Sequence, residues 1–138
     1  MHYIKHYPLA WLVVIAICYL SLFFRTPETE LNDVPFMDKW VHICMYGGLC
    51  TVIWIEYLRR HRVLSLLRLS VGSILCPILL GGILEIVQAT CTTTRTGDWL
   101  DFAANSTGVL LAAAMGYWVW RPLFRRMRCQ HTKRDSLD

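Results

Sequence analysis

Four long apolar segments, separated by short polar loops, constrain the fold of this chain more than any other feature. They cover residues 9–24, 40–58, 64–90 and 99–120. A helix needs roughly 20 predominantly apolar residues to cross the hydrocarbon core of a bilayer, and soluble domains rarely carry several such runs. We therefore predict an all-α fold, an integral membrane four-helix bundle, over residues 1–120.

The composition agrees with this prediction. Of the 138 residues, 55% are hydrophobic and 17% are charged, with a mean hydropathy of +0.39. The six cysteines show no metal-binding spacing, and most lie inside apolar runs, where cysteine behaves as a small hydrophobic residue. No small-residue cleavage site closes the first run, which favours an uncleaved membrane helix. We predict no disulfide framework, no metal and no cofactor.

Three local patterns refine the expected helices. Pro77 interrupts the third segment and predicts a kink, because proline removes a backbone donor. Arg121 and Pro122 predict the end of the fourth helix, which leaves residues 121–138 as a basic cytoplasmic tail. Small residues recur every fourth position in the fourth segment, and this spacing lets membrane helices pack closely. These residues are Ala104, Gly108, Ala112 and Gly116.

The basic residues predict the orientation in the membrane. Eleven of the 14 lysines and arginines lie near the N-terminus, in residues 59–68, or after residue 120. Because cytoplasmic loops are enriched in lysine and arginine, we predict a multi-pass protein of the cell membrane with both termini in the cytoplasm. Four crossings would return the chain to its starting side. The beginning of the second and fourth helices and the end of the third would then lie on the extracytoplasmic side.

Polar side chains gather at this predicted extracytoplasmic end. They are Asp38, Lys39, His42 and Tyr46 of the second segment, Glu85 and Gln88 of the third, and Arg95, Asp98, Asp101 and Asn105 around the start of the fourth. Most are three or four residues apart within their segment and so share one helix face. Ionisable groups at membrane depth cost roughly 2.5–3.5 kcal/mol each and normally face protein or water. We therefore predict that the three groups face one another in a single site.

The motifs resemble those of the VanZ-like family of small multi-spanning membrane proteins. The resemblance rests on Asp38-Lys39-x-x-His42-x-x-x-Tyr46, on Glu85-x-x-Gln88, and on Arg95-x-x-Asp98-x-x-Asp101-x-x-x-Asn105-x-x-Gly108. It covers about residues 8–120. The namesake of the family is associated with resistance to teicoplanin, a glycopeptide antibiotic that acts outside the membrane on cell-wall precursors. The resemblance implies a role at the outer leaflet or the cell envelope, but it supplies no reaction.

Two interpretations of the site do not need catalysis. In the first, the polar groups pair with one another and fix the register of the helices. In the second, Lys39, Arg95 and a protonated His42 hold an anionic headgroup such as a lipid phosphate, which arginine binds through paired hydrogen bonds. The expected partners are then membrane lipids, or a cell-wall precursor or glycopeptide. Nucleic acid is not expected, because a basic tail beside a membrane meets anionic lipid.

A third interpretation is an intramembrane enzyme acting on a lipid-linked substrate. Here His42 is the general base or acid, Asp38 or Asp101 holds it, and Glu85 is the second proton carrier. The pattern offers no obvious nucleophile for a covalent path. A divalent metal bound by His42, Glu85, Asp98 and Asp101 is also chemically reasonable. The sequence leaves these alternatives open.

Overall fold

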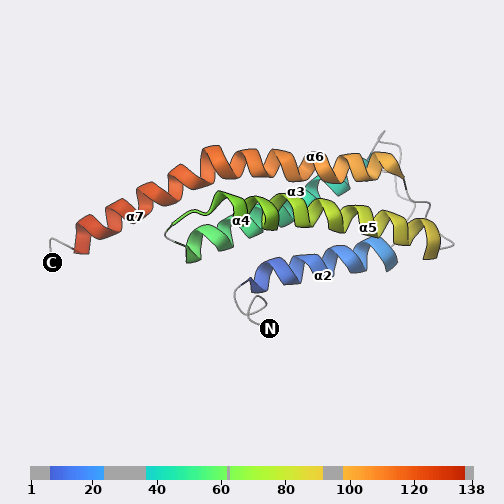
Figure 1. Cartoon of the computed structure of the whole chain (residues 1–138), viewed down its shortest axis with the longest axis horizontal. Coiled ribbons are helices and arrows are strands. Elements are labelled where there is room, and N and C mark those ends of the chain that lie inside the picture. Colours follow the sequence, from blue (N-terminus) through green and yellow to red (C-terminus); the bar gives the residue numbers. More distant parts are fainter. Residues whose placement is uncertain (1–6, 24–36, 62, 92–97, 136–138) are drawn as a thin grey trace.

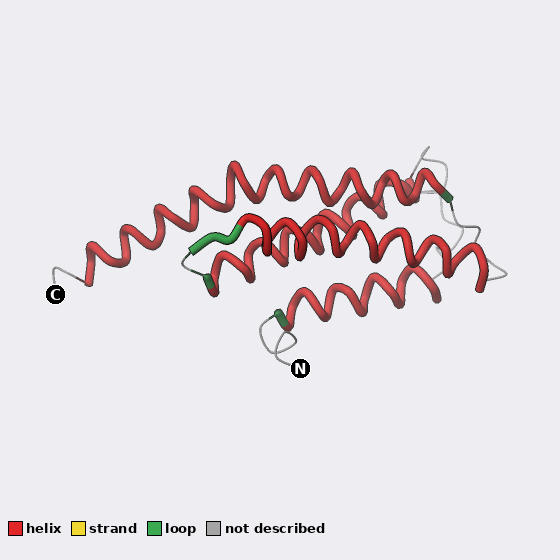
Figure 2. Tube along the Cα trace, in the orientation of Figure 1, coloured by secondary structure: helices red, strands yellow, loops and turns green. Residues whose placement is uncertain are grey.

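The computed structural model of this chain describes residues 7–23, 37–61, 63–91 and 98–135, and all regular structure within these ranges is helical. In chain order the elements are α2 (Pro8–Phe23), α3 (Met37–Arg60), α4 (Leu66–Ser70), η2 (Val71–Leu75), α5 (Cys76–Cys91), α6 (Trp99–Met115), η3 (Gly116–Trp120) and α7 (Arg121–Asp135). The helices run back and forth along one long axis, and α7 extends beyond the others (Figure 1). Figure 2 shows how little of the described chain is loop.

Three helices are long and apolar enough to cross a membrane. They are Met37–Arg60, Leu66–Cys91 and Trp99–Gln130, with mean hydropathies of 1.4, 2.0 and 1.2 over their most apolar windows. The first predicted segment forms the shorter helix α2 of 16 residues. At about 1.5 Å per residue α2 is about 24 Å long, less than the roughly 30 Å of a hydrocarbon core. The all-α prediction is confirmed, and three helices in the described ranges have the length of a membrane span.

Helix α3 lies against both α6 and α2 and supplies more of the core than any other described helix. Tyr46, Leu49 and Trp54 of α3 are buried together with Ile17 of α2 and Val109 of α6. Each described helix also exposes large apolar side chains on the outside of the molecule. An apolar outer surface of this kind is suited to contact with lipid.

The predicted small-residue stripe is confirmed as a packing surface. Its four members on α6 and η3 are all buried. A Cβ atom on Gly108 would overlap the main-chain carbonyl of Ile43, and one on Gly116 would overlap the indole of Trp54. Glycine is therefore required for α3 and α6 to approach this closely. This approach sets the distance between the polar side chains of the two helices.

The predicted end of the fourth helix at Arg121 and Pro122 is wrong. The helix continues as α7 to Asp135, and the π-helical turn η3 ends two residues before Pro122. Pro77, where the sequence predicts a kink, likewise lies two residues after a π-helical turn, η2. A π-helical turn pairs residues five apart, so it shifts the carbonyl that would otherwise face the proline ring. Each proline is thus accommodated inside a continuous helix.

Candidate functional site

The ammonium group of Lys39 lies among three carboxylates. Its Nζ is 2.8 Å from Asp98 Oδ2, also donates to Asp101 Oδ1, and is 3.9 Å from Asp38 Oδ2. Asp38 and Lys39 belong to the first turn of α3, whereas Asp98 is the N-cap of α6 and Asp101 lies in its first turn. The contact therefore holds the beginnings of two helices together. Among the described residues at this end of the molecule Lys39 is the one lysine or arginine, and these carboxylates pair with its charge.

His42 lies one turn deeper in α3 and is almost completely buried, with 5% of its surface exposed. Its Nδ1 is 2.9 Å from Asn105 Oδ1 on α6, and its Nε2 is 3.7 Å from Asp101 Oδ2. An amide oxygen can only accept a hydrogen bond, so Nδ1 carries the proton and donates it to Asn105. The ring is thereby held with Nε2 directed at a carboxylate.

Glu85 brings the third helix to the site. Its Oε2 accepts a hydrogen bond from the backbone N–H of Asp98 at 3.1 Å. Asp98 is the N-cap of α6, and its own Oδ1 accepts from the N–H of Leu100 at 2.9 Å. The Lys39 ammonium and this N–H hold the pKa of the Asp98 carboxyl below its usual value, because both stabilise the ionised form. Glu85 and Asp98 thus link the end of α5 to the beginning of α6.

A glycine also allows α5 to approach the site. A Cβ atom on Gly81 would lie 3.2 Å from Asn105 Nδ2 and 3.3 Å from Tyr46 Cε1, closer than is usual. Tyr46 is fully buried beside this contact, as part of the core below the polar groups. Gln88 is directed to α2, where its Nε2 donates to the carbonyl oxygen of Ser21 at 2.8 Å. Gln88 therefore connects α5 with α2, one turn beyond Glu85.

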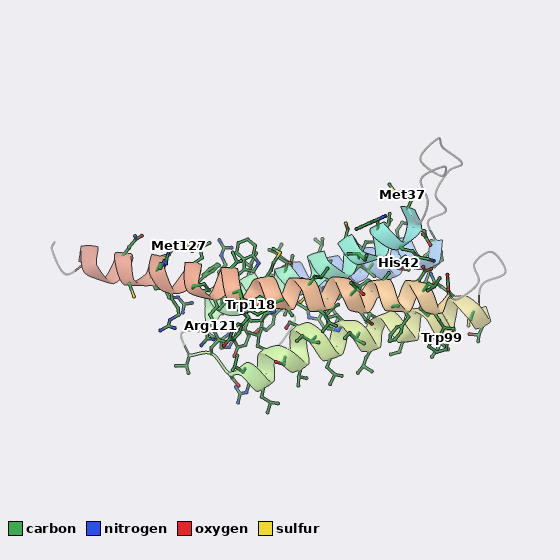
Figure 3. The ribbon with its side chains drawn as sticks, turned by 90° about the horizontal axis from the view of Figure 1, so that it is seen from above. Met37, His42, Trp99, Trp118, Arg121 and Met127 are labelled. Atoms are coloured by element: carbon green, nitrogen blue, oxygen red, sulfur yellow. The ribbon has the colours of Figure 1, made fainter. Side chains whose placement is uncertain are left out.

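The structure brings most of the predicted residues to one end of the molecule. Figure 3 shows Met37, His42 and Trp99 at this end, while Trp118, Arg121 and Met127 lie toward the other. The residues with direct side-chain contacts or hydrogen bonds in the cluster are Asp38, Lys39, His42, Glu85, Asp98, Asp101 and Asn105. Arg95, predicted as a ligand-binding residue, lies outside the described residues. We call the seven contacting residues the acidic site.

Part of the acidic site has the geometry of a metal centre. Asp38, His42 and Asp101 each offer one ligand atom, and these atoms all lie within 4.8 Å of one another. The set differs from the one considered from the sequence, since it includes Asp38 and omits Glu85 and Asp98.

Glu56 lies buried near the end of α3, and the sequence patterns described above assign it no role. Its two carboxylate oxygens accept hydrogen bonds from the N–H groups of Leu9 and Ala10, at 3.2 and 3.1 Å. These are free donors in the first turn of α2, so Glu56 caps that helix from a neighbouring helix. Two sequence features could have predicted this contact. Glu56 is an isolated acid inside an apolar run, and Pro8 is typical of the first position of a helix, whose N–H groups need acceptors.

Comparison with known proteins finds no matching family model, no matching curated protein and no matching solved structure. The resemblance to the VanZ-like family therefore rests on the sequence motifs quoted above and stays a prediction.

Proposed function

We propose that this chain is a VanZ-like, multi-pass protein of the cell membrane whose acidic site binds a ligand of the cell envelope. In this proposal α2 joins the three longer helices as a fourth membrane helix. Both termini lie in the cytoplasm, and the acidic site opens to the outer leaflet. The proposed ligand is an anionic lipid, a cell-wall precursor or a related glycopeptide.

One observation carries the proposal: charged and amide side chains of α3 and α6 contact one another at one end of the molecule, where Glu85 of α5 accepts from the backbone N–H of Asp98. Lys39 and His42 of α3, Glu85 of α5, and Asp98 and Asp101 of α6 take part. Helix register alone could be fixed with fewer charges, because uncharged amides bridge membrane helices for about 0.6–2 kcal/mol each. An excess of ionisable groups at membrane depth favours a functional site.

The charge balance defines how a ligand would be recognised. In the described part of the acidic site four carboxylates face one ammonium group, that of Lys39, which already contacts three of them. Such a site favours hydroxyl and ammonium groups of a ligand, which donate hydrogen bonds to carboxylates. An anionic group needs a further positive charge, and Arg95 is the sequence neighbour that would supply it.

A second candidate function is acid–base catalysis on a lipid-linked substrate. The arrangement of Asn105, His42 and Asp101 favours it, because one partner fixes the ring proton on Nδ1 and leaves Nε2 available as a base. Glu85 is the second proton carrier in this proposal.

Lipid retention tests the binding function. The protein is purified in mild detergent from membranes supplied with a polyprenyl phosphate and analysed by native mass spectrometry. We expect a retained polyprenyl phosphate that is lost in Arg95→Ala and reduced less in Glu85→Gln. Glu56→Gln, at the opposite end, is the matched control and should retain the lipid. Absence of any retained lipid, or equal loss in all three variants, would contradict the proposal.

The His42→Ala variant separates binding from catalysis. If the site is catalytic, this variant should still retain the lipid but stop its conversion, followed by liquid chromatography and mass spectrometry of the lipid extract. If the site only binds, wild-type protein should leave the lipid unchanged. In a susceptible host we also expect expression of the wild-type chain to raise the inhibitory concentration of teicoplanin, and His42→Ala to abolish this increase.

Two native cysteines test the orientation. Cys91 is the last residue of α5, six residues after Glu85, and Cys129 lies in α7; both are exposed. Variants that keep one of them and replace the other cysteines by serine are treated on intact cells with a membrane-impermeant maleimide. We expect Cys91 to react directly and Cys129 to react only after permeabilisation. The opposite pattern would place the acidic site on the cytoplasmic side.

A further inference from the structure

Asp38, His42 and Asp101 form a compact set of metal-ligating side chains within the acidic site. Asp38 and His42 lie one turn apart on α3, and Asp101 faces them from α6. Their ligand atoms lie within 4.8 Å of one another. Metal bonds of about 2.0–2.2 Å to imidazole nitrogen and carboxylate oxygen place two ligands of one ion roughly 3.3–4 Å apart. Small movements of these side chains would complete such a site.

The contact between His42 and Asp101 supplies a second, independent observation. Because Nδ1 is bonded to Asn105, Nε2 is the ring nitrogen that remains available to a second partner. This nitrogen lies 3.7 Å from the carboxylate oxygen Oδ2 of Asp101. A proton on Nε2, or a metal ion in its place, satisfies both the imidazole and the carboxylate. Nε2 of this buried histidine is thus a ligand atom directed at a carboxylate, on the side where Asp38 also lies.

We propose that Asp38, His42 and Asp101 bind one divalent transition-metal ion, of the zinc or manganese class. A mixture of imidazole and carboxylate ligands suits these ions better than calcium or magnesium, which prefer oxygen alone. Three protein ligands leave a coordination position for water or for a ligand group. Asn105 is the positioning residue, because its hydrogen bond to Nδ1 fixes the tautomer that directs Nε2 to the metal.

The surrounding charges agree with this assignment. Lys39 contacts Oδ1 of Asp101, which leaves Oδ2 on the side of His42. The four carboxylates outnumber this ammonium by three charges when all are ionised, and a divalent ion would balance two of them. The contact of Lys39 with Asp38 is the longest of its three, at 3.9 Å, so Asp38 is the carboxylate most easily turned toward an ion.

The metal also explains how an acidic site could hold an anionic headgroup, and in this respect the inference rests on the function proposed above. An ion with an open position provides the positive charge that the described side chains lack. A phosphate oxygen of the headgroup would occupy that position, with Lys39 at its side.

Titration of chelator-treated, detergent-solubilised protein with Zn²⁺ tests the site by calorimetry. We expect saturable binding of one ion per chain. Asp38→Asn should lower the affinity at least about tenfold without disturbing the fold, since this side chain is half exposed. His42→Ala should have an effect at least as large. Asn105→Ala should weaken binding about 10–100-fold, the usual loss when the partner of a ligating histidine is removed.

Asp98→Asn is the matched control. It removes the same charge as Asp38→Asn and keeps the helix cap, because asparagine and aspartate cap equally well, but it leaves the three ligands intact. Zn²⁺ affinity should stay within about twofold of wild type, set against the tenfold loss at a ligand. Absence of saturable binding in the wild type, or equal losses in Asp98→Asn and Asp38→Asn, would overturn the metal site. Lipid retention without Zn²⁺ binding would refute the metal alone, and Zn²⁺ binding without lipid retention would refute the proposed function alone.

Discussion

At the end where α3 begins, charged side chains contact one another and also the backbone at the start of α6. At the end where α3 finishes, Glu56 and Arg128 contact the backbone of helix termini. Lys39 is held by Asp98 and Asp101 at the first end. At the second, Glu56 accepts from the first N–H groups of α2, and Arg128 donates to the carbonyl oxygens of Leu58 and His61, the latter at 3.0 Å. Charged side chains satisfy helix termini at both ends, but in the acidic site they also contact one another.

The difference distinguishes charges that satisfy helix termini, such as those of Glu56 and Arg128, from the carboxylates of the acidic site, which exceed the charge of Lys39. A helix terminus offers a fixed number of free backbone groups and a partial charge of defined sign, so one carboxylate or one guanidinium group satisfies it. Glu56 and Arg128 match these requirements at an N-terminus and a C-terminus respectively. In the acidic site the carboxylates outnumber the ammonium group of Lys39. That excess is one of the observations that support the ligand proposed above.

Removal of the Lys39 charge should produce the largest change in stability. Lys39→Met leaves Asp38, Asp98 and Asp101 facing one another without their cation. Losing one partner of a buried ion pair costs about 3–5 kcal/mol, and we expect about 3 kcal/mol because a fifth of this side chain is exposed. Unfolding with SDS, followed by circular dichroism, measures the change. The deficit should shrink as the pH falls and the carboxylates become protonated; a deficit independent of pH would contradict the charge argument.

Close packing between α3 and α6 should be the next most sensitive feature. Gly108→Ala places a methyl group against the rigid backbone carbonyl of Ile43, and Gly116→Ala places one against the Trp54 side chain. Overpacking costs about 1–3 kcal/mol, and we expect Gly108→Ala to lie at the upper end of this range. Gly48→Ala is the control, since nothing lies within 4 Å of its added methyl group. Equal effects of all three substitutions in SDS unfolding would argue against the close approach.

The cap on α2 should be worth less. Glu56→Gln keeps the shape of the side chain but replaces one of the two accepting oxygens by a donor, so the N–H of Leu9 or Ala10 loses its partner. We expect a loss of about 0.5–2 kcal/mol, the range for removal of an N-cap. Zn²⁺ and lipid binding at the other end should stay unchanged. A loss of binding together with stability would show that the two ends are coupled.

The smallest effect should come from the ionisation of Asp98. Lys39 and the N–H of Leu100 lower the pKa of this carboxyl in the folded protein, so its contribution to stability is fully present above the ordinary aspartate value of about 3.9. It is lost as the pH falls through the lowered folded value. Asp98→Asn should therefore flatten the decline of the melting temperature below about pH 4. If the melting temperature of Asp98→Asn declined below about pH 4 as steeply as that of the wild type, other carboxylates would be the cause of the decline.

The sequence by itself determined the helical class, the close-packing surface and the ten candidates that include the seven residues of the acidic site. Long apolar runs admit few other structures in a bilayer, because every backbone polar group must be satisfied within its own helix. The four-residue spacing of Gly108 and Gly116 places them on one face irrespective of the neighbouring helix. The same periodicity selected His42, Glu85 and Asp101 before their contacts were known.

Only the tertiary structure decided which of these side chains meet. Contacts between two helices depend on how far each is shifted along its axis and how it is rotated about it, and spacing along the chain does not fix either. The polar face of α5 divides, with Glu85 bound to the start of α6 and Gln88 bound to α2. Two π-helical turns admit Pro77 and Pro122 into continuous helices, which local propensity does not predict. Glu56 caps α2 because α3 brings its carboxylate to the free N–H groups of Leu9 and Ala10. These partners precede it in the chain by 47 and 46 positions, so no local pattern predicts which residues pair.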